Sequence, residues 1–105
     1  MTATQEKLTE LDLVSPIIGH VGDGNFHTVL LFDPNSDQDR ARAKEFVAWL
    51  NTLALSMEGT CTGEHGVGQG KKSYIQDELG DAVEIMKTIK QAIDPQNIMN
   101  PGKII

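Results

Sequence analysis

The sequence predicts an α+β fold in which helices pack on an antiparallel β-hairpin. Segments 14–21 and 26–32 are rich in Val, Ile, Leu and Phe, and the Gly-Asp-Gly-Asn run between them, at 22–25, favours a tight turn. Helical periodicity follows further along the chain, over 37–57 and 81–93. Because the chain has 105 residues, we expect a single domain, 1–105, with one modest core.

The helices are predicted from their apolar spacing and their end signals. Segment 4–11 carries few apolar positions, so we expect a helix remnant or a frayed arm there. Ser36 or Asp37 can cap the helix that runs to Met57. One face of that helix should carry Phe46, Leu50, Leu53 and Met57, with Trp49 beside them.

Two further helices are expected in the last third of the chain. The first is short, over about 72–78, and the second runs from Asp81 to Ile93, before Asp94 and Pro95 end it. Its apolar face should comprise Ala82, Met86, Ile89 and Ile93. We expect this last helix and the 37–57 helix to cover one face of the sheet.

Charge and cysteine content exclude several classes of function. The formal net charge of −6 disfavours nucleic acid and anionic lipid as partners. No apolar run approaches the roughly 18 residues of a membrane span, and no signal peptide is evident. We therefore expect a soluble protein, with the cytoplasm as the favoured compartment. The single cysteine, Cys61, cannot form an intramolecular disulfide, and a buried thiol is its more common role than a metal ligand.

Two glycine-rich segments, 19–27 and 59–68, hold all three histidines of the chain. His20 and His27 should lie near the closed end of the hairpin, one on each strand. With Glu64 they would offer two imidazole nitrogens and one carboxylate oxygen, a set typical of a catalytic metal site with one open position. Zinc, manganese and ferrous iron all accept such ligands. His65 follows Glu64 directly and would be available as a base near pH 7.

A simpler interpretation is also open for these residues. His20 and His27 could be half-buried strand residues, and Asp23 and Asn25 could do no more than form an Asx turn. Glu64 and His65 could be solvated loop residues. Spacing alone leaves the two interpretations about equally supported.

The two motifs, taken with the tail 94–103, closely resemble a known family. They read Gly-His-Val-Gly-Asp-Gly-Asn-Phe-His at 19–27 and Gly-Thr-Cys-Thr-Gly-Glu-His-Gly-Val-Gly at 59–68. The chain resembles, from about 11 to 105, the C-terminal portion of FAD-linked oxidoreductases of the vanillyl-alcohol oxidase superfamily that oxidise D-2-hydroxy acids. D-lactate dehydrogenases that reduce cytochrome or quinone are the nearest members, and glycolate oxidase flavoprotein subunits and D-2-hydroxyglutarate dehydrogenases are the next. The resemblance implies a fold like half of a ferredoxin-like cap domain.

The resemblance also implies roles for particular residues. His20, His27 and Glu64 match the divalent-metal ligands of the family, and His65 matches its general base. The substrate's carboxylate and hydroxyl would bind the ion, and His65 would take the hydroxyl proton while hydride passes to the flavin. Asn25 matches a polar residue that lines the substrate site.

Two other positions bear on the resemblance. Asn100 belongs to a tail that, in the family, runs back toward the flavin domain, so we expect it near the cofactor. Val29 replaces the asparagine of the hydroxyglutarate enzymes, which favours the lactate-like branch.

The family's FAD-binding domain has no counterpart in this sequence, and we find no FAD site in it. We therefore expect the metal- and substrate-binding segment of a D-lactate-like dehydrogenase, inactive until joined to an FAD-binding domain or subunit. The alternatives are a stand-alone module that binds a divalent metal or a small acid without redox work, and an interaction domain with a vestigial site. An exposed sheet edge and helix face also predict a homo-oligomer.

Overall fold

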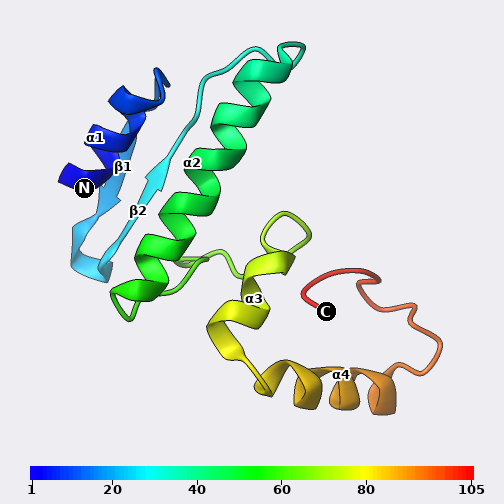
Figure 1. Ribbon diagram of the computed structural model, residues 1–105. Coiled ribbons are helices and arrows are strands. Elements are labelled where there is room, and N and C mark those ends of the chain that lie inside the picture. The colour runs from blue at the N-terminus through cyan, green and yellow to red at the C-terminus, as the bar shows by residue number, and fades with distance from the viewer. The chain divides into compact units, whose positions relative to one another are not determined.

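The computed structural model describes residues 1–105 and contains four α-helices, one short 3-10 helix and a two-stranded antiparallel sheet. The α+β class is therefore confirmed (Figure 1). Contacts divide the chain into two compact units, Met1–Met57 and Glu58–Ile105, and each is described by itself. None of the helices is both long enough and apolar enough to cross a membrane.

The hairpin of the first unit is shorter than predicted. Strands β1 (Ile17–His20) and β2 (Asn25–Thr28) pair in antiparallel register, and the 3-10 helix η1 (Val21–Asp23) forms the turn between them. Gly24 completes the turn with a φ of 72°, in the left-handed region that glycine adopts most easily. Beyond the strands only an isolated bridge joins Val14 to Leu31.

Helix α2 (Asp37–Ser56) begins where the sequence predicts. The hydroxyl oxygen of Ser36 accepts a hydrogen bond from the backbone N–H of Asp39 at 3.2 Å, which is the N-cap arrangement. The helix ends at Ser56, close to the predicted end, and Met57 is its C-cap residue. The placement of Met57 on the apolar face is wrong, because this residue is 74% exposed.

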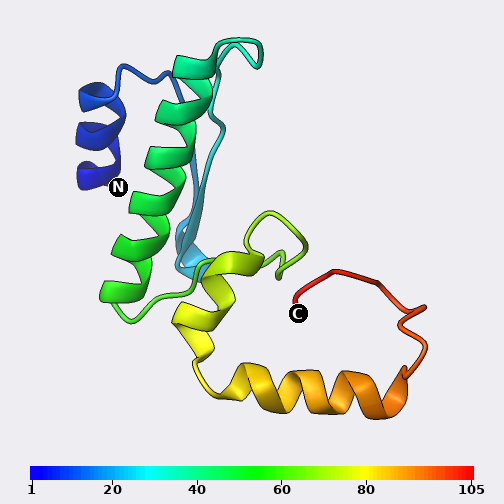
Figure 2. The same ribbon diagram turned by 45° about the vertical axis from the view of Figure 1, so that its right-hand side comes forward.

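Of the two alternatives for the N-terminal segment, the structure shows a helix and not a frayed arm. Helix α1 (Thr2–Glu10) is regular, and Leu8 is completely buried within the first unit. Leu8, Leu13 and Phe46 form the core, and the half-buried side chains that pack on it are Leu11, Ile17, Leu30, Trp49 and Leu50. Figure 2 shows α1 and α2 beside the hairpin. The sparse apolar positions of α1 are sufficient because they face a core supplied by other segments.

The second unit contains α3 (Lys72–Leu79) and α4 (Ala82–Ile93), so both helices predicted there are confirmed. Ile75 and Val83 are buried, whereas Ile89 and Ile93 on the apolar stripe of α4 remain more than half exposed. The expectation that α4 also covers the hairpin sheet stays a prediction.

Candidate metal centre

One face of the hairpin carries both histidines. His20 pairs with Asn25 and Ile18 pairs with His27. Residues directly opposite each other, and alternate residues along a strand, share a face. These four side chains therefore project from the same face, and Ile17, which packs on the core, lies on the other.

The two imidazoles lie close enough to share an ion. Their ring centroids are 5.1 Å apart, with an angle of 81° between the ring planes. A ligand nitrogen of His20 lies within 4.8 Å of one of His27. Two nitrogens bound to one zinc ion at about 2.0–2.1 Å each would be roughly 3–4 Å apart. Small side-chain rotations would therefore allow His20 and His27 to bind the same cation.

Asn25 lies on the same face as the histidine pair. Its strand position opposite His20 places its amide beside the imidazoles, and the side chain is only partly exposed. An amide offers both donors and an acceptor, as a substrate carboxylate and hydroxyl would require.

Glu64 and His65 occupy the glycine-rich loop of the second unit. Gly63 and Gly66 flank them, with left-handed φ values of 58° and 73°. Glu64 Oε1 and His65 Nε2 are 3.5 Å apart, and the side chains are 41% and 75% exposed, respectively. The loop thus presents a carboxylate and an imidazole side by side, and their predicted roles in a metal site stay predictions.

The start of this loop is bound to α3 through Cys61. The backbone N–H of Cys61 donates to Glu78 Oε2 at 3.0 Å, and the Lys71 ammonium donates to the Cys61 carbonyl. Cys61 is 3% exposed, so it is buried as predicted. Burial, together with the neighbouring Glu78 carboxylate, raises the pKa of the Cys61 thiol to about 11. A thiol with that pKa is a poor metal ligand and nucleophile near neutral pH.

Glu78 and Lys71 are residues that the sequence analysis missed. The hydrogen bond from the Cys61 backbone lowers the pKa of Glu78, so this carboxylate stays ionised beside the loop. They lie 17 and 10 residues from Cys61. No motif with that spacing is known to signal such contacts, and only the placement of α3 shows them.

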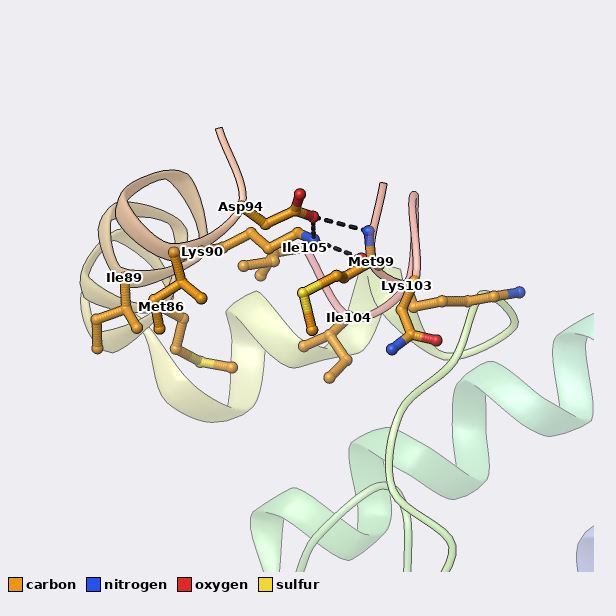
Figure 3. A pocket seen from close by; sticks show the side chains of 10 residues that line it. Met86, Ile89, Lys90, Asp94, Met99, Lys103, Ile104 and Ile105 are labelled. Carbon is orange, nitrogen blue, oxygen red and sulfur yellow. Dashed lines mark hydrogen bonds and ion pairs between the residues drawn. The ribbon is translucent and has the colours of Figure 1, made fainter. Parts of the chain in front are cut away.

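Asn100 belongs to a tail that folds back along α4. Asp94 accepts hydrogen bonds from the backbone N–H groups of Ile98 at 3.0 Å and Met99 at 2.9 Å, and it pairs with Lys90 (Figure 3). The Lys90 ammonium also donates to the Met99 carbonyl. The pKa of Asp94 is lowered to about 2, mainly by the hydrogen bond from Lys90 and also by these backbone donors.

An open cleft of about 340 Å³ lies between α4 and this tail, and Asn100 is among the residues that line it. Figure 3 shows that apolar side chains of the helix and the tail make up most of its wall. The predicted placement of Asn100 near a flavin stays a prediction.

The chain matches the family described as FAD linked oxidases, C-terminal domain, over residues 1–104, which is all of the chain except its last residue. It belongs to this family.

Individual relatives make the placement more specific. The chain is 48% identical to D-lactate dehydrogenase [cytochrome], mitochondrial, of Arabidopsis thaliana, an alignment that covers 100% of this chain and 19% of that protein. It is 47% identical to the probable D-lactate dehydrogenase, mitochondrial, of Danio rerio, over 97% of this chain and 21% of the relative. It is 36% identical to the glycolate oxidase subunit GlcD of Bacillus subtilis, over 97% of this chain and 22% of that subunit. The chain thus spans about a fifth of the length of these relatives.

Proposed function

We propose that this chain is the metal- and substrate-binding segment of an FAD-dependent D-2-hydroxy-acid dehydrogenase with a D-lactate-like substrate. The observation that carries the proposal is the His20–His27 pair on one hairpin face, with ring centroids 5.1 Å apart. The names of the relatives favour D-lactate or glycolate as the substrate class.

In this proposal His20, His27 and Glu64 hold one divalent cation, with zinc as the first candidate because its usual ligands are imidazole and carboxylate. Such a cation supplies Lewis-acid polarisation of the substrate oxygens. Glu64 contributes the negative charge of the set, and the two imidazoles come from the paired strands.

Asn25 and His65 act on the bound hydroxy acid. The Asn25 amide hydrogen-bonds the substrate next to the histidine pair and orients it. An imidazole nitrogen of His65 accepts the proton of the substrate hydroxyl. Because His65 directly follows Glu64 in the sequence, one loop carries both groups.

The redox step requires a partner to this chain. FAD supplies the hydride acceptor in the FAD-linked oxidases. We propose that an FAD-binding domain or subunit joins the chain, that Asn100 faces the cofactor, and that the chain alone does not oxidise substrate.

Metal content tests the first part of the proposal. The purified full chain, supplied with zinc and desalted, should retain about one equivalent per chain by elemental analysis. His27→Ala should lose it, whereas His65→Ala, which removes an imidazole that is not a proposed ligand, should retain it. A wild-type chain that holds no zinc would contradict the metal site.

Complementation tests the redox part and the main alternative. Mixing the zinc-loaded chain with the FAD-binding portion of a D-lactate dehydrogenase relative should restore D-lactate-dependent dye reduction, which His65→Ala should abolish. If zinc binds but a well-folded mixture remains inactive, the chain is instead a stand-alone divalent-metal or small-acid binding module.

Self-association and compartment belong to the same proposal. Ile85, Ile93 and Ile98 of the second unit are at least 64% exposed. Several exposed apolar side chains in one unit favour a homo-oligomer, in which a second copy of the chain would cover them. Sedimentation of the chain as a monomer in dilute solution would contradict self-association.

The cytoplasm remains the proposed compartment. Fractionation of cells that express the chain would test this proposal.

A further inference from the structure

The loop that carries Glu64 and His65 has no secondary structure of its own, yet both of its ends are attached to other segments of the second unit. At its start, Cys61 is buried against α3. At its end, the Gly68 carbonyl accepts a hydrogen bond from the backbone N–H of Ile104 at 3.0 Å.

The attachment at Cys61 involves both polar groups of one residue's backbone. Glu78 accepts from the Cys61 N–H, and Lys71 donates to the Cys61 carbonyl. Glu78 reaches this site from the last turn of α3, and Lys71 is the residue that precedes the same helix. Because both contacts are charge-assisted and partly buried, each is stronger than an ordinary turn hydrogen bond.

Because the backbone within the loop is flexible in principle at its glycines, the attachment at Cys61 can influence the loop conformation. Gly63 and Gly66 adopt left-handed conformations on either side of Glu64 and His65. Glycine at these positions permits many other conformations. The loop therefore depends on its attached ends for the direction in which Glu64 and His65 point.

We propose that Glu78 and Lys71 are positioning residues, which hold the 61–68 loop so that Glu64 and His65 are presented to the site. The inference rests on the proposed function for the roles of Glu64 and His65. The ordering of the loop by Glu78 and Lys71 does not depend on that function. It follows from their hydrogen bonds with the Cys61 backbone.

Loop order is measured by NMR on the metal-free full chain. Glu78→Ala should lower the 15N–1H heteronuclear NOE of Glu64 and His65 and leave that of α4 unchanged. Glu78→Gln should restore it, because the amide oxygen can still accept from the Cys61 N–H. Asp77→Ala, an exposed carboxylate one position earlier on the same helix, is the matched control and should have no effect.

The zinc affinity provides the functional readout. Changes to residues that support metal ligands weaken binding by about 10- to 100-fold, and we expect roughly 10-fold for Glu78→Ala. Lys71→Ala should act in the same direction, with the adjacent exposed Lys72→Ala as its control. If Glu78→Ala does not fold, Lys71→Ala gives the same measurement, since it removes the other half of the attachment.

Three outcomes would be decisive. Unchanged loop order in both variants would overturn the inference, and so would a disordered loop with unchanged zinc affinity. A wild-type chain that binds no zinc would overturn the proposed function instead. Loop order without metal would then still decide whether Glu78 and Lys71 hold the loop.

Discussion

The hairpin and the glycine-rich loop carry the same kinds of ligand group but hold them in different ways. His20 and His27 project from paired strands whose other face packs on an apolar core. Glu64 and His65 project from a loop attached through carboxylate and ammonium contacts to backbone groups. The first arrangement depends on buried apolar area, and the second on ionised side chains. The two should therefore respond differently to core truncation, backbone substitution and acid.

Removal of the core beneath the hairpin should have the largest effect. Phe46 is completely buried, so Phe46→Ala should cost about 3–5 kcal/mol of unfolding free energy through lost burial and a cavity. Urea unfolding, followed by the fluorescence of the single tryptophan, Trp49, reports on this unit because its ring centroid is 6.1 Å from that of Phe46. The exposed Thr52→Ala on the same helix serves as the control. A cost below about 1 kcal/mol would show that the core does not support the hairpin.

Loss of one hairpin imidazole should have the next largest effect. We expect His27→Ala to weaken zinc binding by more than about 100-fold, beyond the range for residues outside the ligand set. Competition with a chromophoric chelator would measure it. His65→Ala should change the affinity much less, and equal losses in the two variants would contradict the division of roles between ligand and base.

Backbone substitution at the hairpin turn should cost less. Gly24 has a φ of 72° and open space around the position of a β-carbon, so Gly24→Ala tests backbone strain alone. The left-handed conformation should cost about 1–2 kcal/mol. Gly22→Ala also places its methyl group in open space, without a positive φ, and should change the unfolding free energy by less than about 0.5 kcal/mol. Equal effects of the two substitutions would exclude strain as the cause.

Acid should affect the second unit locally, through the ionised carboxylate of Asp94. The pKa of Asp94 is about 2 in the folded chain against an ordinary value of 3.8. A lowered pKa in the folded state stabilises the protein above the unfolded value, and that stabilisation is lost as the pH falls from about 4 to about 2. NMR signals of Ile98 and Met99 should therefore change over this range in the wild type.

Asp94→Asn is the control for this acid response. Because the variant has no carboxyl group to protonate at this position, its tail signals should lack the transition between pH 4 and 2. A transition of the same size in the variant would assign the effect to another group. The hairpin signals of His20 and His27 should not follow the Asp94 transition in either protein.

Local sequence was sufficient for much of the fold and for the identity of the candidate groups. Turn chemistry at 22–25 predicted the hairpin, and Ser36 predicted the start of α2, because both depend on contacts within a few residues. The same tight turn predicted that His20 and His27 lie near each other, and their ring centroids are 5.1 Å apart. The two motifs also predicted the family correctly, because each has several histidine, glutamate or glycine residues within ten positions.

Packing between distant segments decided the rest. Segment 4–11 has too few apolar positions to predict a stable helix, yet Leu8 is fully buried because Leu13 and Phe46 complete its surroundings. Glu78 and Lys71 had no signature in the sequence, since their partner is a backbone group that every residue possesses. The candidate ligand residues were therefore evident in the sequence, whereas the contacts of Glu78 and Lys71 with Cys61 depended on where α3 lies after folding.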